Sequence, residues 1–130
     1  MIEILPMQDR EREREILKGI KGAGPQARVL AMCERGQTLG TAALELEGSV
    51  LRILQLTAED YDFSEAPRGE TVFLLDSLMR SAASYGENFG AVSIETAFED
   101  FFGFFRPRGF DCDDTHAFTP MSTIVKYEFH

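Results

Sequence analysis

Aromatic side chains are concentrated in one short stretch of the sequence, where they could stack on a ligand or on nucleobases. Residues 98–110, FEDFFGFFRPRGF, hold six of the eleven phenylalanines of the chain. Four of the six follow the i, i+3, i+4, i+7 spacing of one helical face: Phe98, Phe101, Phe102 and Phe105. Pro107 predicts that this helix ends near Phe105, because proline cannot continue a helix. Since helical aromatic stripes usually belong to a core, the spacing favours a buried helix over a ligand surface.

The side chains best suited to metal or thiol chemistry are scattered. The sequence has two cysteines and two histidines: Cys33, Cys112, His116 and His130. They form no CxxC pair and no paired histidine spacing, so we expect neither a metal site nor a disulfide framework, and a reduced, cytoplasmic setting is the simpler interpretation. Cys33 alternates with Val29 and Ala31, which is typical of a core residue on a strand rather than of a nucleophile.

Length and charge restrict the class of protein further. A chain of 130 residues can bury a real core, and we expect a single domain over residues 1–130. The formal net charge of −9 argues against a general affinity for nucleic acid or anionic membranes, and no basic stripe accompanies the phenylalanines. The N-terminal segment becomes highly charged after seven residues, unlike a signal peptide, and no apolar run approaches the length of a membrane span.

The first half of the chain predicts a strand, a helix and three further strands. The strand covers residues 2–7, and the helix covers residues 9–22 with Asp9 as its N-cap. Opposite charges recur three positions apart along this helix, so we interpret them as a solvated, self-paired face without a catalytic role. Strands follow at residues 28–35, 38–47 and 50–58, joined by the turns RGQ and GS. The last of the three is apolar on both faces, which is typical of a central strand.

The second half predicts elements that complete a mixed sheet. A polar, acidic loop over residues 59–70 precedes a helix over 71–86, and Gly86 is a natural stop for that helix. A strand over 90–97, the phenylalanine helix and a last strand over 122–129 follow. The predicted order is β-α-β-β-β-α-β-α-β, an α/β (α+β) fold in which helices pack on both faces of a mixed sheet.

This order, together with FRPRGF at residues 105–110, resembles the GNAT superfamily of acyl-CoA-dependent N-acetyltransferases. In that family a central strand leads into a loop of the form Gln/Arg-x-x-Gly-x-Gly/Ala, which opens a helix and holds the pyrophosphate of CoA on backbone N–H groups. Here LQLTA matches the strand, and APRGETVFLLDSL matches the loop and helix. The resemblance therefore implies that acetyl-CoA is held by these residues: Leu56, Thr57, Ala58, Arg68, Gly69, Glu70 and Thr71. Gly109 and Phe110 match the glycine and phenylalanine of the family's Y-x-x-x-Gly-Phe pattern.

The same resemblance implies roles in acetyl transfer. The backbone around residues 56–58, where the central strand of the family bulges, would polarise the thioester carbonyl group. Glu59 is the best candidate for the base that takes the proton of the amine, with a solvated loop acid as the alternative, and Asp60 is a similar, weaker candidate. Tyr61 and Tyr85 could donate a proton only if they fold into the cleft.

The sequence also departs from the pattern of the family. Phe105 stands where the family often has a tyrosine that acts as general acid, and phenylalanine has no hydroxyl group to donate. Phe98 stands near the place of a frequent asparagine, and Thr71 stands at the place of the second glycine. Five acids lie on or near the loop, with Arg68 to offset them: Glu59, Asp60, Asp62, Glu65 and Glu70. Because the loop acids repel the phosphates, we expect CoA to bind weakly or not at all.

Two functions therefore remain open at this point. The first is an N-acetyltransferase that uses acetyl-CoA or another acyl-CoA to acylate a small-molecule amine or a protein acceptor. The second is a catalytically silent module with the same fold that binds a partner or another ligand. Phe105 and the acidic loop favour the silent module, whereas Gly69 at the start of a good helix favours a CoA site. We expect no metal, no nucleic acid and no membrane partner, and we leave a homodimer open.

Overall fold

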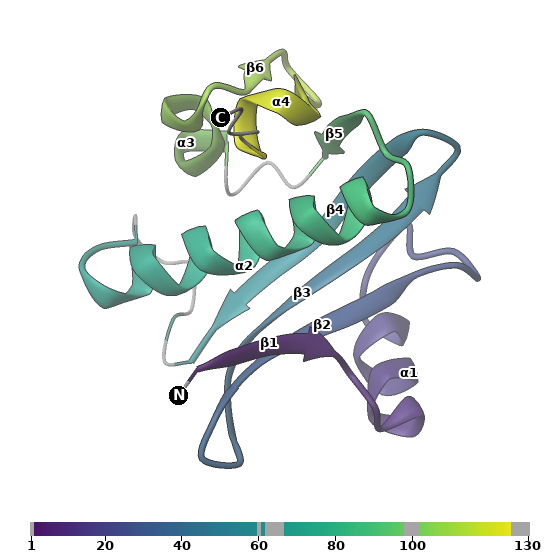
Figure 1. Ribbon diagram of the computed structural model, residues 1–130, viewed down its shortest axis with the longest axis vertical. Coiled ribbons are helices and arrows are strands. Elements are labelled where there is room, and N and C mark those ends of the chain that lie inside the picture. The colour runs from purple at the N-terminus through teal and green to yellow at the C-terminus, as the bar shows by residue number, and fades with distance from the viewer. Residues whose placement is uncertain (1, 60, 62–66, 98–101, 126–130) are drawn as a thin grey trace, which may run out of the picture.

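The computed structural model describes residues 2–59, 61, 67–97 and 102–125, without the side chain of Phe102. In these residues a sheet of seven strands forms in the order β1-β2-β3-β4-β5-β7-β6 (Figure 1). Neighbouring strands are antiparallel except β4 and β5, which are parallel. The strands are Glu3–Pro6 (β1), Arg28–Glu34 (β2), Gln37–Glu47 (β3), Val50–Ala58 (β4), Ser93–Thr96 (β5), Asp111–Cys112 (β6) and Ala117–Pro120 (β7).

Four α-helices and one 3₁₀ turn are described beside the sheet. The α-helices are Arg10–Lys18 (α1), Glu70–Asn88 (α2), Phe102–Phe105 (α3) and Met121–Ile124 (α4), and Arg106–Arg108 form the 3₁₀ turn. The predicted mixed sheet with flanking helices is confirmed. Helix α1 begins after its predicted N-cap, since the Asp9 carboxylate accepts a hydrogen bond from Arg12 N at 3.1 Å. It ends at Lys18 rather than at residue 22, because the chain turns at Gly19.

Helices α1 and α2 pack on opposite faces of the sheet. The main core lies under α2 and joins that helix to alternate side chains of the central strands, among them Leu30, Ala42, Leu56 and Ile94. A smaller core lies under α1 and contains the side chains that point the other way, among them Val29, Ala31 and Ala43. Cys33 packs against this second core, as its alternation predicts. None of the helices that the structure describes is long and apolar enough to cross a membrane.

The two hairpins follow the predicted turns closely. Arg35 and Gly36 connect β2 to β3 and both have positive φ, 52° and 80°, which is the geometry of a type I′ turn. Such a turn matches the twist of antiparallel strands, and Glu34 and Gln37 pair across it. These short turns place β2, β3 and β4 side by side, so that the apolar run of β4 lies in the middle of the sheet.

One extra residue in β4 changes which side of the strand faces α2. The register with β3 shifts between Ala43 and Leu44, and this leaves Leu54 unpaired as a bulge. Four side chains of β4 still face the main core, although their spacing is irregular: Leu51, Ile53, Leu56 and Ala58. Leu54 turns instead to the core under α1. The nearly continuous apolar run is therefore explained by the bulge, which lies before residues 56–58 and not within them.

The end of the chain differs from the prediction. We expected a last strand over residues 122–129, but Ser122 to Ile124 belong to α4, and residues 126–129 lie outside the described part. The closing strand is β7 instead, where Ala117 and Thr119 are buried and alternate with exposed neighbours. Met121 and Ile124 are also buried, at the i, i+3 spacing of a helical turn. The apolar pattern that suggested a strand thus belongs partly to a short helix.

The phenylalanine segment is part of the core where the structure describes it. Phe105 has 0% of its surface exposed, and its ring centre lies 4.9 Å from that of Phe110 and 5.5 Å from that of Phe104. Arg108 covers the Phe104 ring at 3.8 Å and donates a hydrogen bond to Asp76 of α2 at 2.7 Å. The core position predicted for Phe105 is confirmed, whereas Phe98, Phe101 and the Phe102 side chain lie outside the described part.

Candidate functional site

The most distinctive feature of the sheet is the place where β4 and β5 stop pairing. Their parallel pairing runs from Val50 with Ser93 to Ile53 with Thr96. At its end the Thr96 hydroxyl group donates a buried hydrogen bond to the carbonyl oxygen of Ile53 at 2.8 Å. Strand β4 continues for five more residues, to Ala58. Among the described residues, no strand pairs with that side of β4 beyond Ile53, so the sheet opens there.

Two backbone N–H groups of β4 point into this opening. Glu59 N donates to the carbonyl oxygen of Leu39 at 2.8 Å, which marks this pair as a hydrogen-bonded one. Pairs alternate along an antiparallel ladder, and Leu56 and Ala58 occupy the alternate positions, opposite Ala42 and Gly40. The N–H groups of Leu56 and Ala58 therefore point away from β3, toward the side that β5 leaves open. Thr57, between them, points its N–H toward β3.

Glu59 stands at the end of β4 with its side chain exposed. Its carboxylate accepts a hydrogen bond from Gln37 Nε2 at 2.7 Å. Because side chains alternate along a strand and Ala58 faces the main core, Glu59 points to the face of the sheet that carries α1. Glu59 thus lies directly after residues 56–58, where the resemblance implies that the thioester binds. Its carboxylate, however, is hydrogen-bonded to Gln37 of the β2–β3 hairpin. The weaker candidate, Asp60, lies outside the described residues.

The start of α2 has the backbone of an open anion site. Gly69 is the N-cap, and its φ of 58° and ψ of −127° are values that side-chain-bearing residues avoid. Among the described residues, nothing lies within 4 Å of where a Cβ at this position would be, so they leave open space beside the backbone. Glycine supplies no side-chain oxygen to the first-turn N–H groups, and Thr71 N donates to Arg68 O at 3.2 Å. Arg68 and Glu70 are exposed on either side, one attracting an anion and one repelling it.

The position where the GNAT family often has a tyrosine as general acid carries no proton donor in this chain. Phe105 fills that position and is enclosed in the core, so no side chain there reaches the surface. Tyr85 stacks on Phe89 with ring centres 4.8 Å apart, near the C-terminal end of α2 and far from its start. Tyr61 packs partly against the main core.

Sequence reasoning missed one pair of titratable side chains. His116 Nε2 lies 3.3 Å from Glu95 Oε1, and His116 Nδ1 lies 2.8 Å from the Thr115 hydroxyl oxygen. Asp113 holds this turn by accepting hydrogen bonds from the backbone N–H groups of Thr115 and His116, and these bonds lower the pKa of the Asp113 carboxyl group. The alternation in SIET could have placed Glu95 on the polar face of its strand. Its partner, His116, could not be predicted, because no strand was expected at the position of β7.

The Glu95–His116 pair lies beside the opening, on the face opposite α2. Ile94 and Thr96 are buried, so Glu95 between them points to the α1 face. It is in register with Arg52 of β4, one residue before the pairing ends. Glu59 is about 20 Å further along β4 at the usual rise of a strand. The structure therefore offers two separate candidates for a base rather than one cluster. Within the described residues, no three metal-binding side chains converge.

Comparison with known proteins identifies the fold. No family model matches this chain, and no curated protein matches it. Among solved structures, it is similar to an acetyltransferase of the GNAT family from Staphylococcus aureus, with a TM-score of 0.63 and 11% identity over 93% of this chain and 99% of that one. The ribosomal-protein-S18-alanine N-acetyltransferase from Escherichia coli has a TM-score of 0.63 and 10% identity over all of both chains. A Bacillus subtilis acetyltransferase in complex with CoA has a TM-score of 0.63 and 10% identity over 92% and 99%.

These similarities confirm the resemblance at the level of fold. The chain has the architecture of the GNAT acetyltransferases, with the parallel pair β4–β5 at its centre and an open N-terminus of α2 beside it. About one residue in ten is identical, so the similarity shows the fold alone. Any chemical activity has to follow from the residues of the site.

Proposed function

We propose that this protein transfers an acetyl group from acetyl-CoA to the nitrogen of an amine. The observation that carries the proposal is the opening after Ile53 and Thr96, into which Leu56 and Ala58 point their N–H groups. A thioester carbonyl group that lies in the opening would accept a hydrogen bond from Leu56 N. Negative charge develops on that oxygen during transfer, and a fixed N–H donor in such a place typically contributes about 10²–10³-fold to the rate.

The start of α2 fits the phosphates of CoA. Backbone N–H groups of the first turn and the positive end of a 19-residue helix favour an anion there. Arg68 adds a positive charge, and the open space beside Gly69 allows a phosphate to approach the backbone. We propose residues 56–58 and 68–71 as the binding site for acetyl-CoA. Glu70 makes it a weak site, because its charge opposes the phosphates.

The amine must lose a proton before or during its attack, and this chain offers two carboxylates for the task. We propose Glu59 as the base, acting directly or through one water molecule. Glu95 is the second candidate, since His116 could accept a proton that Glu95 relays. No group at position 105 can protonate the leaving thiolate. A thiol has an ordinary pKa near 8.5, so a thiolate can depart near neutral pH without a dedicated acid.

The similar solved structures indicate only the general class of the amine that accepts the acetyl group. One neighbour is named for a protein alanine as acceptor and another for an aminoglycoside, which supports a protein or a small-molecule amine as the substrate class. A cytoplasmic setting, a single domain over residues 1–130 and a homodimer remain predictions of the same proposal.

The decisive experiment measures binding and turnover separately. Isothermal titration of acetyl-CoA into the protein should give a dissociation constant in the high micromolar to millimolar range. A thiol-release assay against a panel of primary amines and N-terminal peptides should then detect acetyl transfer. Binding with no transfer to any amine would favour the alternative, a silent module that holds CoA or a partner. That alternative is favoured by the complete burial of Phe105.

A further inference from the structure

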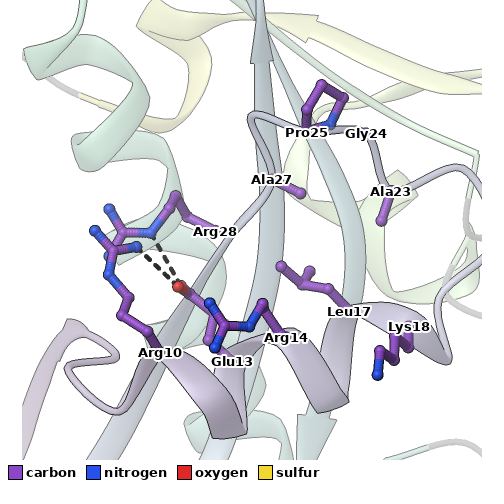
Figure 2. A pocket seen from close by; sticks show the side chains of 10 residues that line it. All are labelled: Arg10, Glu13, Arg14, Leu17, Lys18, Ala23, Gly24, Pro25, Ala27 and Arg28. Atoms are coloured by element: carbon purple, nitrogen blue, oxygen red, sulfur yellow. Dashed lines mark hydrogen bonds and ion pairs between the residues drawn. The ribbon is translucent and has the colours of Figure 1, made fainter.

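A groove lies between α1 and the loop that leads into β2, on the opposite side of the sheet from α2 (Figure 2). Its volume is about 560 Å³. One wall is a row of cationic side chains on α1, and the other is formed by Ala23, Gly24 and Pro25. Leu17 points from the helix toward Ala27 and forms an apolar floor (Figure 2). No lining residue comes from β4, β5 or α2, so the groove is separate from the proposed acetyl-CoA site.

The charge of this groove is opposite to that of the whole chain. Four cations and one carboxylate line it, whereas the chain has a net charge of −9. The carboxylate is Glu13, which is 3% exposed and holds two of the four cations, Arg10 and Arg28, at 2.9 Å each. Lys18 pairs with Glu15 at 3.5 Å on the exposed face of the helix. The Arg14 side chain is exposed and makes no hydrogen bond or ion pair with any residue that the structure describes. Positive charge therefore remains available for an anionic ligand.

Both walls are fixed before any ligand arrives. Glu13 accepts a hydrogen bond from Val29 N at 2.9 Å and so fastens α1 to β2. Glu45 of β3 is 7% exposed and accepts hydrogen bonds from Gly24 N at 3.1 Å and Gln26 N at 3.2 Å, which fasten the loop to the sheet. A groove with fixed walls loses little conformational freedom on binding. Two buried carboxylates thus build the groove, and of these two only Glu13 pairs with a cation of the outer row, Arg10.

The spacing of the row indicates the shape of the ligand. Arg10, Arg14 and Lys18 are four residues apart on α1 and so repeat about every 6 Å along the helix axis. In an extended chain, side chains two positions apart point the same way and repeat about every 6.6–6.8 Å. Acidic side chains at alternate positions would therefore meet the cations one by one, while small side chains between them face the apolar floor. A single phosphate could engage only one part of this row.

We propose that this groove binds an extended peptide segment of another protein that carries acidic side chains at alternate positions. Charge complementarity selects the acids, the 6 Å repeat selects their spacing, and the shallow apolar floor selects small intervening residues. Such a contact would bind a partner protein next to α1 and would leave the opening between β4 and β5 free for acetyl-CoA.

The test uses the full chain and a fluorescein-labelled peptide, Gly-Glu-Ala-Glu-Ala-Glu-Gly with blocked ends. Fluorescence anisotropy at low ionic strength should show saturable binding that weakens as salt rises. Arg14→Glu should weaken binding about tenfold, because it replaces an attraction with a repulsion. Arg12→Glu is the matched control, since it makes the same change of charge on the same helix at a residue that does not line the groove. Both residues are exposed, so both variants should fold.

Three results would overturn the proposal. They are the absence of saturable binding at low ionic strength, an equal loss of affinity in Arg12→Glu and Arg14→Glu, and equal affinity for a peptide of the same composition whose three glutamates are contiguous. Acetyl transfer is measured separately in the same variants and should stay unchanged, so a failure here leaves the proposed enzymatic function untouched.

Discussion

Replacing Phe105 with alanine should lower the free energy of unfolding by about 3–5 kcal/mol, the usual cost of removing a buried phenylalanine. The ring is fully buried and belongs to the core that joins α2 to the sheet. It also contacts Phe104 and Phe110 in tilted or edge geometry, and such a contact adds about 0.5–1.5 kcal/mol beyond burial. We therefore expect a loss in the upper half of the range.

The assay is urea unfolding followed by far-ultraviolet circular dichroism, with the midpoint and the slope fitted separately. Phe73→Ala on α2 is the matched control, because that phenylalanine is 60% exposed and should cost no more than about 0.5 kcal/mol. Phe105→Tyr tests the missing acid directly. It would bury a hydroxyl group in an apolar site, at a cost of about 1–3 kcal/mol if no partner is found, and should not raise the rate of acetyl transfer.

The reasoning would be refuted by a Phe105→Ala variant that unfolds within about 1 kcal/mol of the wild type. It would also be refuted if Phe73→Ala cost as much, since burial would then not explain the difference. A Phe105→Tyr variant with clearly faster acetyl transfer would show that position 105 faces the reacting groups, as it does where the family carries a tyrosine.

Three further predictions concern the site and its electrostatics. Glu70→Gln should tighten acetyl-CoA binding several-fold in calorimetry, because it removes an exposed negative charge at the start of α2, and unchanged affinity would remove Glu70 from the site. Glu59→Gln should lower kcat by roughly 10²–10⁴-fold with little change in acetyl-CoA affinity, and the same loss in Glu95→Gln instead would move the role of base to the Glu95–His116 pair. Burial acts to raise the pKa of Glu13, but hydrogen bonds from Val29, Arg28 and Arg10 prevail, so its folded pKa lies below the ordinary 4.5. The Glu13 carboxylate should therefore stabilise the fold fully above about pH 4.5 and progressively less as the pH falls through its folded pKa, and Glu13→Gln should flatten that acid limb in thermal unfolding at pH 3 to 6.

Much of the fold could be predicted because local rules and tertiary packing agree in the first half of the chain. The turn at Arg35 and Gly36 and the apolar run of β4 both specify antiparallel neighbours, and the predicted bounds of β4 are those observed. The charge pairs of α1 were predicted as a solvated face. Glu13 departs from this, because its carboxylate reaches β2 and is buried by contacts that no helical spacing reveals.

The C-terminal part was harder to predict for a physical reason. Strand β7 is only four residues long and contains Pro120, so its pattern is weaker than that of the apolar segment after it. It forms because β5 needs a partner on its outer side, which is a property of the sheet rather than of the local sequence. The Glu95–His116 pair depends on that strand, because His116 directly precedes it. The pair could therefore not be predicted without β7. The bulge at Leu54 could not be predicted either, because a continuous apolar run has the same sequence pattern whether or not one of its residues is unpaired.

The absence of a tyrosine at position 105 does not by itself make the fold catalytically silent. The N–H groups that we propose to polarise the thioester come from the backbone of β4, and their direction is set by pairing with β3. That pairing is independent of the side chain at position 105. A dedicated acid or base contributes about 10²–10⁴-fold, and a fixed oxyanion donor contributes about 10²–10³-fold on its own. A chain that keeps the opening and the Leu56 N–H but lacks the acid should therefore be a slow transferase, whose rate rises when the thiolate leaves more easily. Residual transfer that Leu56→Pro abolishes, in a variant that still binds acetyl-CoA, would locate catalysis in the backbone of β4.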